Sequence, residues 1–178
     1  MRSTGKMGHG AGGLGRGNRP QRSATILATV GGLGNVPLGP GTWGSLVGLF
    51  VGLAIVRSLS QPSAAALLGA SFVLFASICT VAERELGQHD PGSVILDEVW
   101  GMAAVVVAQP WLAASWMLLV AFVLFRLFDI FKVPPLKLLA RWPAGWGIMA
   151  DDLGAAAYTI LILWLARQAA GFMPQAPG

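Results

Sequence analysis

The run SAAALLGASFVLFASICTVA at residues 63–82 decides the fold. It carries no charged side chain, and about 20 consecutive apolar residues are what an α-helix needs to cross a bilayer. The rest of the chain agrees, because 54% of its 178 residues are hydrophobic, 11% are charged, and the mean hydropathy is +0.65. These values are too apolar for an ordinary soluble domain. The sequence therefore predicts an integral membrane protein.

Four further apolar runs accompany this segment, at residues 43–59, 94–108, 111–125 and 153–170. Together the five runs predict an all-α, multispanning membrane helical bundle of about four to five membrane helices. The third and fourth runs in chain order are short for a full crossing, which takes about 20 residues at 1.5 Å each. Pro62 and Pro110 mark breaks between helices, because proline cannot continue an interior helical hydrogen-bond ladder.

The chain is expected to form one membrane domain with two short ends. Residues 1–23 are rich in glycine and arginine and predict a disordered tail, residues 24–172 form the single membrane-embedded domain, and residues 173–178 form a short C-terminal tail. The formal charge of +4 does not indicate nucleic-acid binding, because the basic residues form no stripe with aromatic platforms. The single cysteine, Cys79, lies in an apolar run and is expected to be a small core residue.

The basic residues predict the orientation. With the basic N-terminal tail in the cytoplasm, five crossings place the loops around residues 35–42, 83–93 and 126–152 on the same side. Only Arg57 and Arg167 of the twelve Lys and Arg residues then lie outside, and such asymmetry orients multispanning proteins. All eight acidic residues fall in or beside the same loops, although acidic residues contribute little to topology. We therefore expect a functional site at the cytoplasmic end.

Acidic residues in three motifs are the main candidates for this site. They lie in ILDEVWG at 95–101, FRLFDIFK at 125–132 and GWGIMADD at 145–152, and they are Asp97, Glu98, Asp129, Asp151 and Asp152. A carboxylate at the bilayer centre costs roughly 2.5–3.5 kcal/mol on insertion scales, so such residues are functional candidates. The structural alternatives are a solvated helix start for the first motif and helix capping for the third. Clustered carboxylates favour a hard cation such as Mg²⁺, and His89 has neither a second histidine nor a thiolate nearby to form a zinc site.

Two segments are candidates for binding a phosphate. Arg126 and Lys132 recur with Asp129 at every third residue and so line one helix face, where an internal salt-bridge ladder is the alternative. The turn GGLGNVPLGPGTWGS at 31–45 opens onto a helix start, where Thr42 and Ser45 hydroxyls add to backbone donors that can bind an anion. A plain interfacial turn is an equal alternative there. Asn35 in this turn and Asp90 are further candidates.

The remaining polar and aromatic residues have structural interpretations. Glu83, Arg84 and Glu85 fit a solvated helix end. Gly101 predicts the close approach of another helix backbone. The tryptophans near helix ends are expected to be interfacial anchors, namely Trp43, Trp100, Trp111, Trp142 and Trp146.

With these motifs in order, the chain resembles the phosphatidylglycerophosphatase A family. The resemblance rests on PGTWGSL at 40–46, HDPGS at 89–93 with DEVWG at 97–101, FRLFDIFK at 125–132 and GIMADD at 147–152, and it covers about residues 24–170. Two departures are visible: Val133 follows the lysine where the family usually has proline, and Ala156 stands where a glycine is usual. Neither departure removes a charged group.

The resemblance implies an all-helical, Mg²⁺-dependent enzyme that converts phosphatidylglycerophosphate to phosphatidylglycerol in bacterial phospholipid biosynthesis. It further implies a multi-pass protein of the bacterial inner membrane with its active site facing the cytoplasm, so that the partners are the phospholipid substrate and the membrane. On this hypothesis Mg²⁺ is held by a subset of Asp97, Glu98, Asp129, Asp151 and Asp152, while the phosphate is gripped by Thr42, Ser45, Arg126 and Lys132. The nucleophile is either a water or an aspartate.

Three other functions fit part of the pattern. A phosphatase or transferase acting on another lipid phosphate would use the same groups. A cation transporter would place acidic residues at mid-membrane depth, whereas these gather at one face. A structural adaptor gives no account of four polar motifs that converge on one side.

Overall fold

A computed structural model of the chain describes residues 23–134, 136–169 and 171, and every regular element within them is helical. The predicted tails at 1–23 and 173–178 lie outside these residues, apart from Ser23. The helices are α1 (Ser23–Ala28), α2 (Pro40–Ser58), α3 (Gln61–Leu86), α4 (Leu96–Ala108), α5 (Met117–Phe131), α6 (Leu136–Leu139) and α7 (Gly145–Ala169), with short 3₁₀ helices at Leu33–Asn35 and Pro110–Ala114. The prediction of an all-α fold is confirmed.

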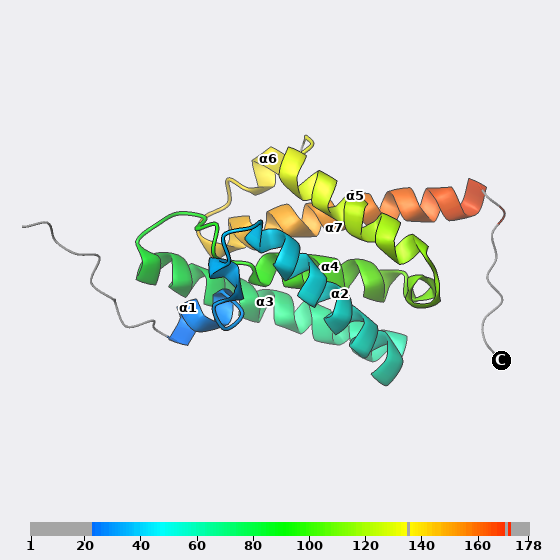
Figure 1. Cartoon of the computed structure of the whole chain (residues 1–178), viewed down its shortest axis with the longest axis horizontal. Helices are drawn as coiled ribbons and strands as arrows, with labels where there is room; N and C mark the ends of the chain where they lie inside the picture. The colour runs from blue at the N-terminus through cyan, green and yellow to red at the C-terminus, as the bar shows by residue number, and fades with distance from the viewer. Residues whose placement is uncertain (1–22, 135, 170, 172–178) are drawn as a thin grey trace, which may run out of the picture.

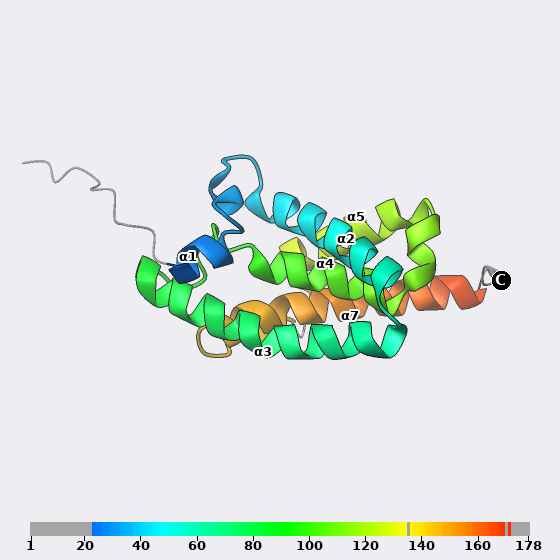
Figure 2. The same cartoon turned by 90° about the horizontal axis from the view of Figure 1, so that it is seen from below.

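Five of these helices run along the long axis of the molecule and alternate in direction (Figures 1 and 2). Helices α2, α4 and α7 begin at the end of the bundle where α3 and α5 finish, and the short α1 and α6 lie there too. We call this the site end. The turn between α2 and α3 and the 3₁₀ helix between α4 and α5 lie at the opposite end. The loops that the sequence predicts on one side therefore do come together.

Among the described residues, three helices are long and apolar enough to cross a membrane: α2, α3 and α7, which contain 18-residue windows with mean hydropathies of 1.3, 2.2 and 1.5. The prediction of four to five membrane helices exceeds this number. Helices α4 and α5 have 13 and 15 residues, which correspond to about 20 and 22 Å against a bilayer core of about 30 Å. The fourth apolar run loses its first residues to the separate 3₁₀ helix Pro110–Ala114, which shortens α5.

Helix α4 is the central helix, and nearly all of its residues are buried. It pairs most extensively with α2, because glycines of α2 face it: a Cβ at Gly44 would lie 2.9 Å from the Ile95 carbonyl oxygen, and one at Gly52 would lie 2.7 Å from Val106 Cβ. Small residues let helix backbones approach in this way. At Gly101 the ring of Phe125 on α5 occupies the space of a side chain, so the close approach predicted there is made by a side chain and not by a helix backbone.

Two other core positions test the sequence predictions. Cys79 of α3 is fully buried in the core, as expected for a small core residue. Trp100 is buried as well, and its Nε1 donates to the Leu68 carbonyl oxygen at 3.1 Å and to Ser71 Oγ at 3.2 Å. The prediction of an interfacial anchor is therefore wrong for Trp100, whose indole instead fastens α4 to α3.

Helix α7 begins eight residues earlier than the apolar run at 153–170 predicts. Gly145 starts it because the backbone of α3 at Ala76 and Thr80 fills the place of a side chain there, and the Gly145 N–H donates to Thr80 Oγ1 at 3.1 Å. As a result, Asp151 and Asp152 lie inside the helix, where their side chains cap no helix end. The capping alternative for these two residues is wrong.

Candidate active site

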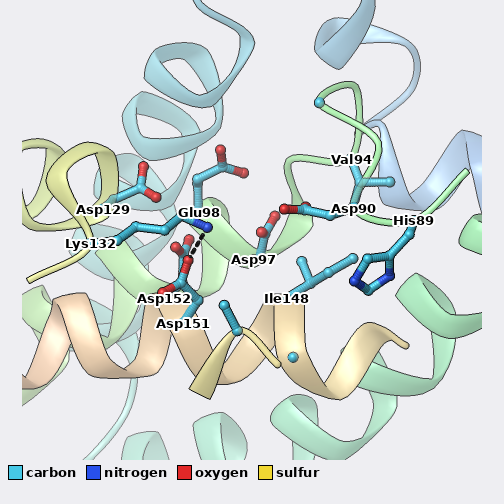
Figure 3. Close-up of a pocket in the computed structure, with 13 residues that line it drawn as sticks. His89, Asp90, Val94, Asp97, Glu98, Asp129, Lys132, Ile148, Asp151 and Asp152 are labelled. Atoms are coloured by element: carbon cyan, nitrogen blue, oxygen red, sulfur yellow. Dashed lines mark ion pairs between the residues drawn. The ribbon is translucent and has the colours of Figure 1, made fainter. Parts of the chain in front are cut away.

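A cavity of about 140 Å³ opens at the site end between α4, the end of α5, the start of α7 and the loop before α4 (Figure 3). Its polar lining comes from every acidic motif that the sequence singled out. The lining residues are His89, Asp90, Gly92, Val94, Asp97, Glu98, Asp129, Lys132, Ala140, Gly147, Ile148, Asp151 and Asp152. The structure thus brings together residues that are more than 60 positions apart in the sequence.

Asp97 and Glu98 lie in the first turn of α4; 8% of Asp97 as a whole residue and 13% of the Glu98 side chain are exposed. The interpretation as a solvated helix start is therefore wrong. The N-terminus of a helix favours carboxylates, but neither Asp97 Oδ1 nor Glu98 Oε2 has a hydrogen-bond partner among the described residues. Two buried carboxylates consequently face the cavity with unused oxygens.

Arg126 connects α5 to two other helices. Its Nη1 lies 2.5 Å from Asp129 Oδ2, donates to Ser45 Oγ on α2 at 3.3 Å, and is 3.8 Å from Glu98 Oε1 on α4. The internal salt-bridge alternative accounts for Arg126 and Asp129, which pair on the same helix. It does not account for Glu98, which belongs to a different helix.

Lys132 pairs across helices. The residue ends α5 in the left-handed conformation, with φ of 43°, and its Nζ lies 2.5 Å from Asp151 Oδ2 of α7. Burial lowers the pKa of Lys132, but the hydrogen bond and the charge of Asp151 outweigh it, so the pKa is raised above its usual value. Lys132 is therefore a cation at the cavity wall.

Asp151 and Asp152 complete the acidic lining from α7. Both are buried, and Asp151 Oδ1 and Asp152 Oδ2 lack partners among the described residues. Ligand oxygens lie within 4.8 Å of one another in two groups, one formed by Asp97, Glu98 and Asp152 and the other by Asp129, Asp151 and Asp152. Hard divalent cations take carboxylate oxygens as ligands, so both groups fit a metal such as Mg²⁺.

The turn before α2 and the start of α2 contribute less directly to the cavity. Thr42 is exposed in the first turn of α2, whereas Ser45 is fully buried, donates to the Gly41 carbonyl oxygen at 2.9 Å and accepts from Arg126. Asn35 is exposed in the 3₁₀ helix Leu33–Asn35 and does not line the cavity. A Cβ at Gly41 would collide with Glu98 Oε1 and lie 2.8 Å from the Arg126 guanidinium nitrogens, so α2 meets the site through a glycine.

Glu83 is a residue that the sequence analysis missed. Only 7% of it is exposed, and its Oε1 accepts from the Asp90 N–H at 2.8 Å and lies 2.8 Å from His89 Nδ1. The prediction of a solvated helix end is therefore wrong for Glu83, which holds the loop that carries His89 and Asp90 into the cavity wall. The signal in the sequence was an acidic residue close before His-Asp at a helix end.

Glu85 also accepts hydrogen bonds, but away from the cavity. Its Oε2 accepts from the N–H of Thr25 at 3.0 Å and from the Thr25 hydroxyl at 2.6 Å, which fastens α1 to α3. Neither Glu85 nor Thr25 lines the cavity. Glu85 is thus an acidic residue of the site end with a structural role.

Comparison with known proteins adds independent findings. The family model described as Phosphatidylglycerophosphatase A matches residues 26–167. A protein named phosphatidylglycerophosphatase A from Haemophilus influenzae is 36% identical over 140 residues, which cover 78% of this chain and 85% of the relative. One of the same name from Escherichia coli K12 is 33% identical over 146 residues, covering 78% and 80%. A Bacteroides thetaiotaomicron protein, provisionally named phosphatidylinositol-3-phosphatase, is 30% identical over 160 residues, covering 86% and 99%. No solved structure is significantly similar to the chain.

Proposed function

The chain belongs to the phosphatidylglycerophosphatase A family, which makes it a phosphoric monoester hydrolase, and we propose that it hydrolyses phosphatidylglycerophosphate with Mg²⁺ as cofactor. Water is consumed, the bond between phosphorus and the terminal glycerol oxygen breaks, and the products are phosphatidylglycerol and inorganic phosphate. The observation that carries this proposal is the cavity at the site end, which is lined by six carboxylates and Lys132, and where Arg126 of α5 pairs with two of the lining carboxylates, Glu98 and Asp129.

The metal part of the proposal is supported by unsatisfied oxygens. Four buried carboxylate oxygens lack partners among the described residues: Asp97 Oδ1, Glu98 Oε2, Asp151 Oδ1 and Asp152 Oδ2. A buried polar group without a partner costs about 1–3 kcal/mol, and more when it is charged, so these oxygens are explained by a ligand that they bind. When bound there, Mg²⁺ supplies positive charge against the charge that develops on the phosphoryl oxygens.

Arg126 and Lys132 are the residues that we propose hold the phosphate. Arg126 has an unpartnered buried Nε, and its guanidinium is fixed by Asp129 and Ser45, so it is oriented before substrate arrives. Lys132 is 36% exposed at the cavity wall and can turn from Asp151 to a phosphoryl oxygen. Thr42, exposed in the first turn of α2, would add a hydroxyl donor. In this arrangement Ser45 orients Arg126, because its own hydroxyl is buried and engaged.

The location of the cavity supports a lipid substrate. It lies at one end of a bundle that contains three helices able to cross a membrane, so a lipid can keep its acyl chains in the bilayer while its head group enters the cavity. We propose that this end faces the cytoplasm of a bacterial inner membrane, because ten of twelve basic residues fall on that side in the sequence. The same placement argues against a transporter, whose acidic residues would lie midway along the spans.

A second candidate substrate is another lipid phosphate, such as a phosphoinositide. The Bacteroides thetaiotaomicron relative, whose provisional name specifies phosphatidylinositol-3-phosphatase, favours this alternative. Both substrates present a phosphate monoester on a lipid, and the cavity groups would serve either one. Phosphate release from both lipids at equal concentration in mixed micelles distinguishes them, and we expect faster release from phosphatidylglycerophosphate.

The proposal is tested by phosphate release from phosphatidylglycerophosphate by detergent-purified protein, with Mg²⁺ and with a chelator. We expect release that requires Mg²⁺ and that Asp129→Asn abolishes, because Asp129 belongs to one of the acidic groups and orients Arg126. Glu85→Gln is the matched control, since it also neutralises an acidic residue of the site end but lies outside the cavity. Circular dichroism checks that both variants are folded. Wild-type protein that releases phosphate equally well in chelator would refute the metal part of the proposal.

A further inference from the structure

We infer that the site holds two divalent cations, with Asp152 as the carboxylate that bridges them. The inference rests on the proposed function and extends it from one cofactor ion to a paired site. Its starting observation is that the carboxylates form two groups of three, and Asp152 is the residue common to both. One group adds Asp97 and Glu98, and the other adds Asp129 and Asp151.

The helices place Asp152 between the other members of the two groups. Asp97 and Glu98 come from α4, and Asp129 comes from the end of α5. Figure 3 shows Asp129 on one side of the cavity and Asp97 on the other, with the two aspartates of α7 below Glu98. Asp152 reaches this position because Gly101 of α4 leaves room: a Cβ at Gly101 would lie only 3.3 Å from Asp152 Cβ.

Unpartnered oxygens occur in both groups. The residues that carry these oxygens are Asp97 and Glu98 in the first group, Asp151 in the second, and Asp152 in both. Asp97, Asp151 and Asp152 are each more than nine-tenths buried. One ion in the first group would leave Asp151 without a metal contact, and one ion in the second group would leave Asp97 and Glu98 without one. Two ions give each of these four residues a metal to bind.

The net charge of the cavity also supports two divalent cations. When all six cavity carboxylates are ionised, they face the two cations Arg126 and Lys132 with a net charge of −4; the six are Asp90, Asp97, Glu98, Asp129, Asp151 and Asp152. One divalent cation reduces this charge to −2, which still repels a phosphate, whereas two divalent cations neutralise it. Paired ions about 3.5–4 Å apart are a known arrangement for in-line phosphoryl displacement, in which they stabilise both the attacking and the leaving oxygen.

The test counts ions directly, with Mn²⁺ as the probe and the full-length protein stripped of metal in detergent. Equilibrium dialysis should give two Mn²⁺ per chain, and electron paramagnetic resonance should show the two ions magnetically coupled. Asp97→Asn should keep one ion, with an uncoupled six-line spectrum, because the second group is intact. Asp152→Asn should weaken the binding of both ions by more than tenfold, because both groups lose a ligand. Glu85→Gln should bind two coupled ions like wild type, since it lies outside both groups.

Two results would overturn the inference: one Mn²⁺ per wild-type chain at saturation, or two ions without magnetic coupling. Equal binding by wild type and a folded Asp97→Asn variant would also contradict it. A parallel phosphate-release assay separates this failure from that of the proposed function. Active protein with a single ion removes the inference and keeps the phosphatase, whereas two coupled ions without hydrolysis of any lipid phosphate keep the paired site and remove the phosphatase.

Discussion

The two ends of the helical bundle both contain buried polar side chains, but the hydrogen bonding of these side chains differs between the ends. At the end opposite the site, Nε2 of the buried Gln109 donates to the Ile160 carbonyl oxygen at 3.1 Å, and Nε2 of the exposed Gln61 donates to the Val107 carbonyl oxygen at 2.6 Å. The Trp111 N–H in turn donates to Gln109 Oε1 at 2.6 Å. At the site end, four carboxylate oxygens and Arg126 Nε are buried without partners.

This difference distinguishes polar groups that stabilise the fold from polar groups that are available to bind a ligand. A buried side chain whose donors and acceptors are paired within the protein stabilises the helix packing. A cluster of buried carboxylates without partners is destabilising unless something else binds it. Satisfaction of hydrogen bonds, more than polarity itself, therefore distinguishes the site from the opposite end, and the following predictions test that distinction.

The largest effect is expected from Asp152→Asn. The substitution removes the carboxylate shared by both acidic groups, so phosphate release should fall by more than about 100-fold, since loss of even an indirect metal-site contact costs 10- to 100-fold. In chelator, however, its melting temperature should equal or exceed that of wild type, because one uncompensated buried charge is gone. Activity within threefold of wild type, or a lower melting temperature in chelator, would place Asp152 with the structural polar groups instead.

Arg126→Lys should have the next largest effect. Lysine keeps the charge but lacks the fork that contacts Asp129, Ser45 and Glu98 together, so kcat/KM should fall about 10- to 100-fold. We expect Mn²⁺ binding to change little, because Arg126 is no metal ligand. Steady-state kinetics and Mn²⁺ dialysis on the same preparation measure both. A variant with unchanged kcat/KM would mean that the charge alone suffices.

Gly41→Ala should have an intermediate effect. The added Cβ would displace Glu98 and the Arg126 guanidinium, and displacements of this size should lower kcat/KM about tenfold. Gly69→Ala on α3 is the matched control, because a Cβ there meets no atom within 4 Å. The control should keep full activity and gain about 0.5–1 kcal/mol of helix stability. Equal kinetics for the two alanine variants would show that α2 does not constrain the site.

The smallest effect on activity is expected at the opposite end. Gln109→Leu leaves the Ile160 carbonyl oxygen and the Trp111 N–H without their partners, which should destabilise the protein by about 1 kcal/mol. Phosphate release should stay within twofold of wild type, because the residue is remote from the cavity. Thermal unfolding and initial rates check this prediction. Activity that falls tenfold in a stable variant would show that the two ends are coupled.

Much of this arrangement was predictable from the sequence, for physical reasons. An alternating bundle brings every second loop to one end, so the acidic motifs around Asp97, Asp129 and Asp151 had to converge once the helices were recognised. The first helical turn of α7 was not predictable, because Gly145 and Gly147 look like helix breakers until the backbones packed against them are known.

The sequence could not show how the acidic residues divide into groups. The sharing of Asp152 depends on the rotational phase of three helices, which is set by contacts such as Phe125 against Gly101. The role of Glu83 depends on the turn in which Asp90 has a φ of 46° and points its N–H back to the carboxylate. The number of spans was overestimated because apolar composition does not reveal where α4 and α5 end.

The most direct test of the central claim is the melting temperature of wild-type protein in saturating Mg²⁺ and in chelator, beside Asp152→Asn and Glu85→Gln. If the unpaired carboxylates form a cation site, Mg²⁺ at about 100 times its dissociation constant adds about 2.7 kcal/mol to the stability of wild type. The melting temperatures of wild type and Glu85→Gln should then rise clearly, whereas that of Asp152→Asn should rise little. Identical melting temperatures for wild type with and without Mg²⁺ would contradict the claim that these carboxylates bind a divalent cation.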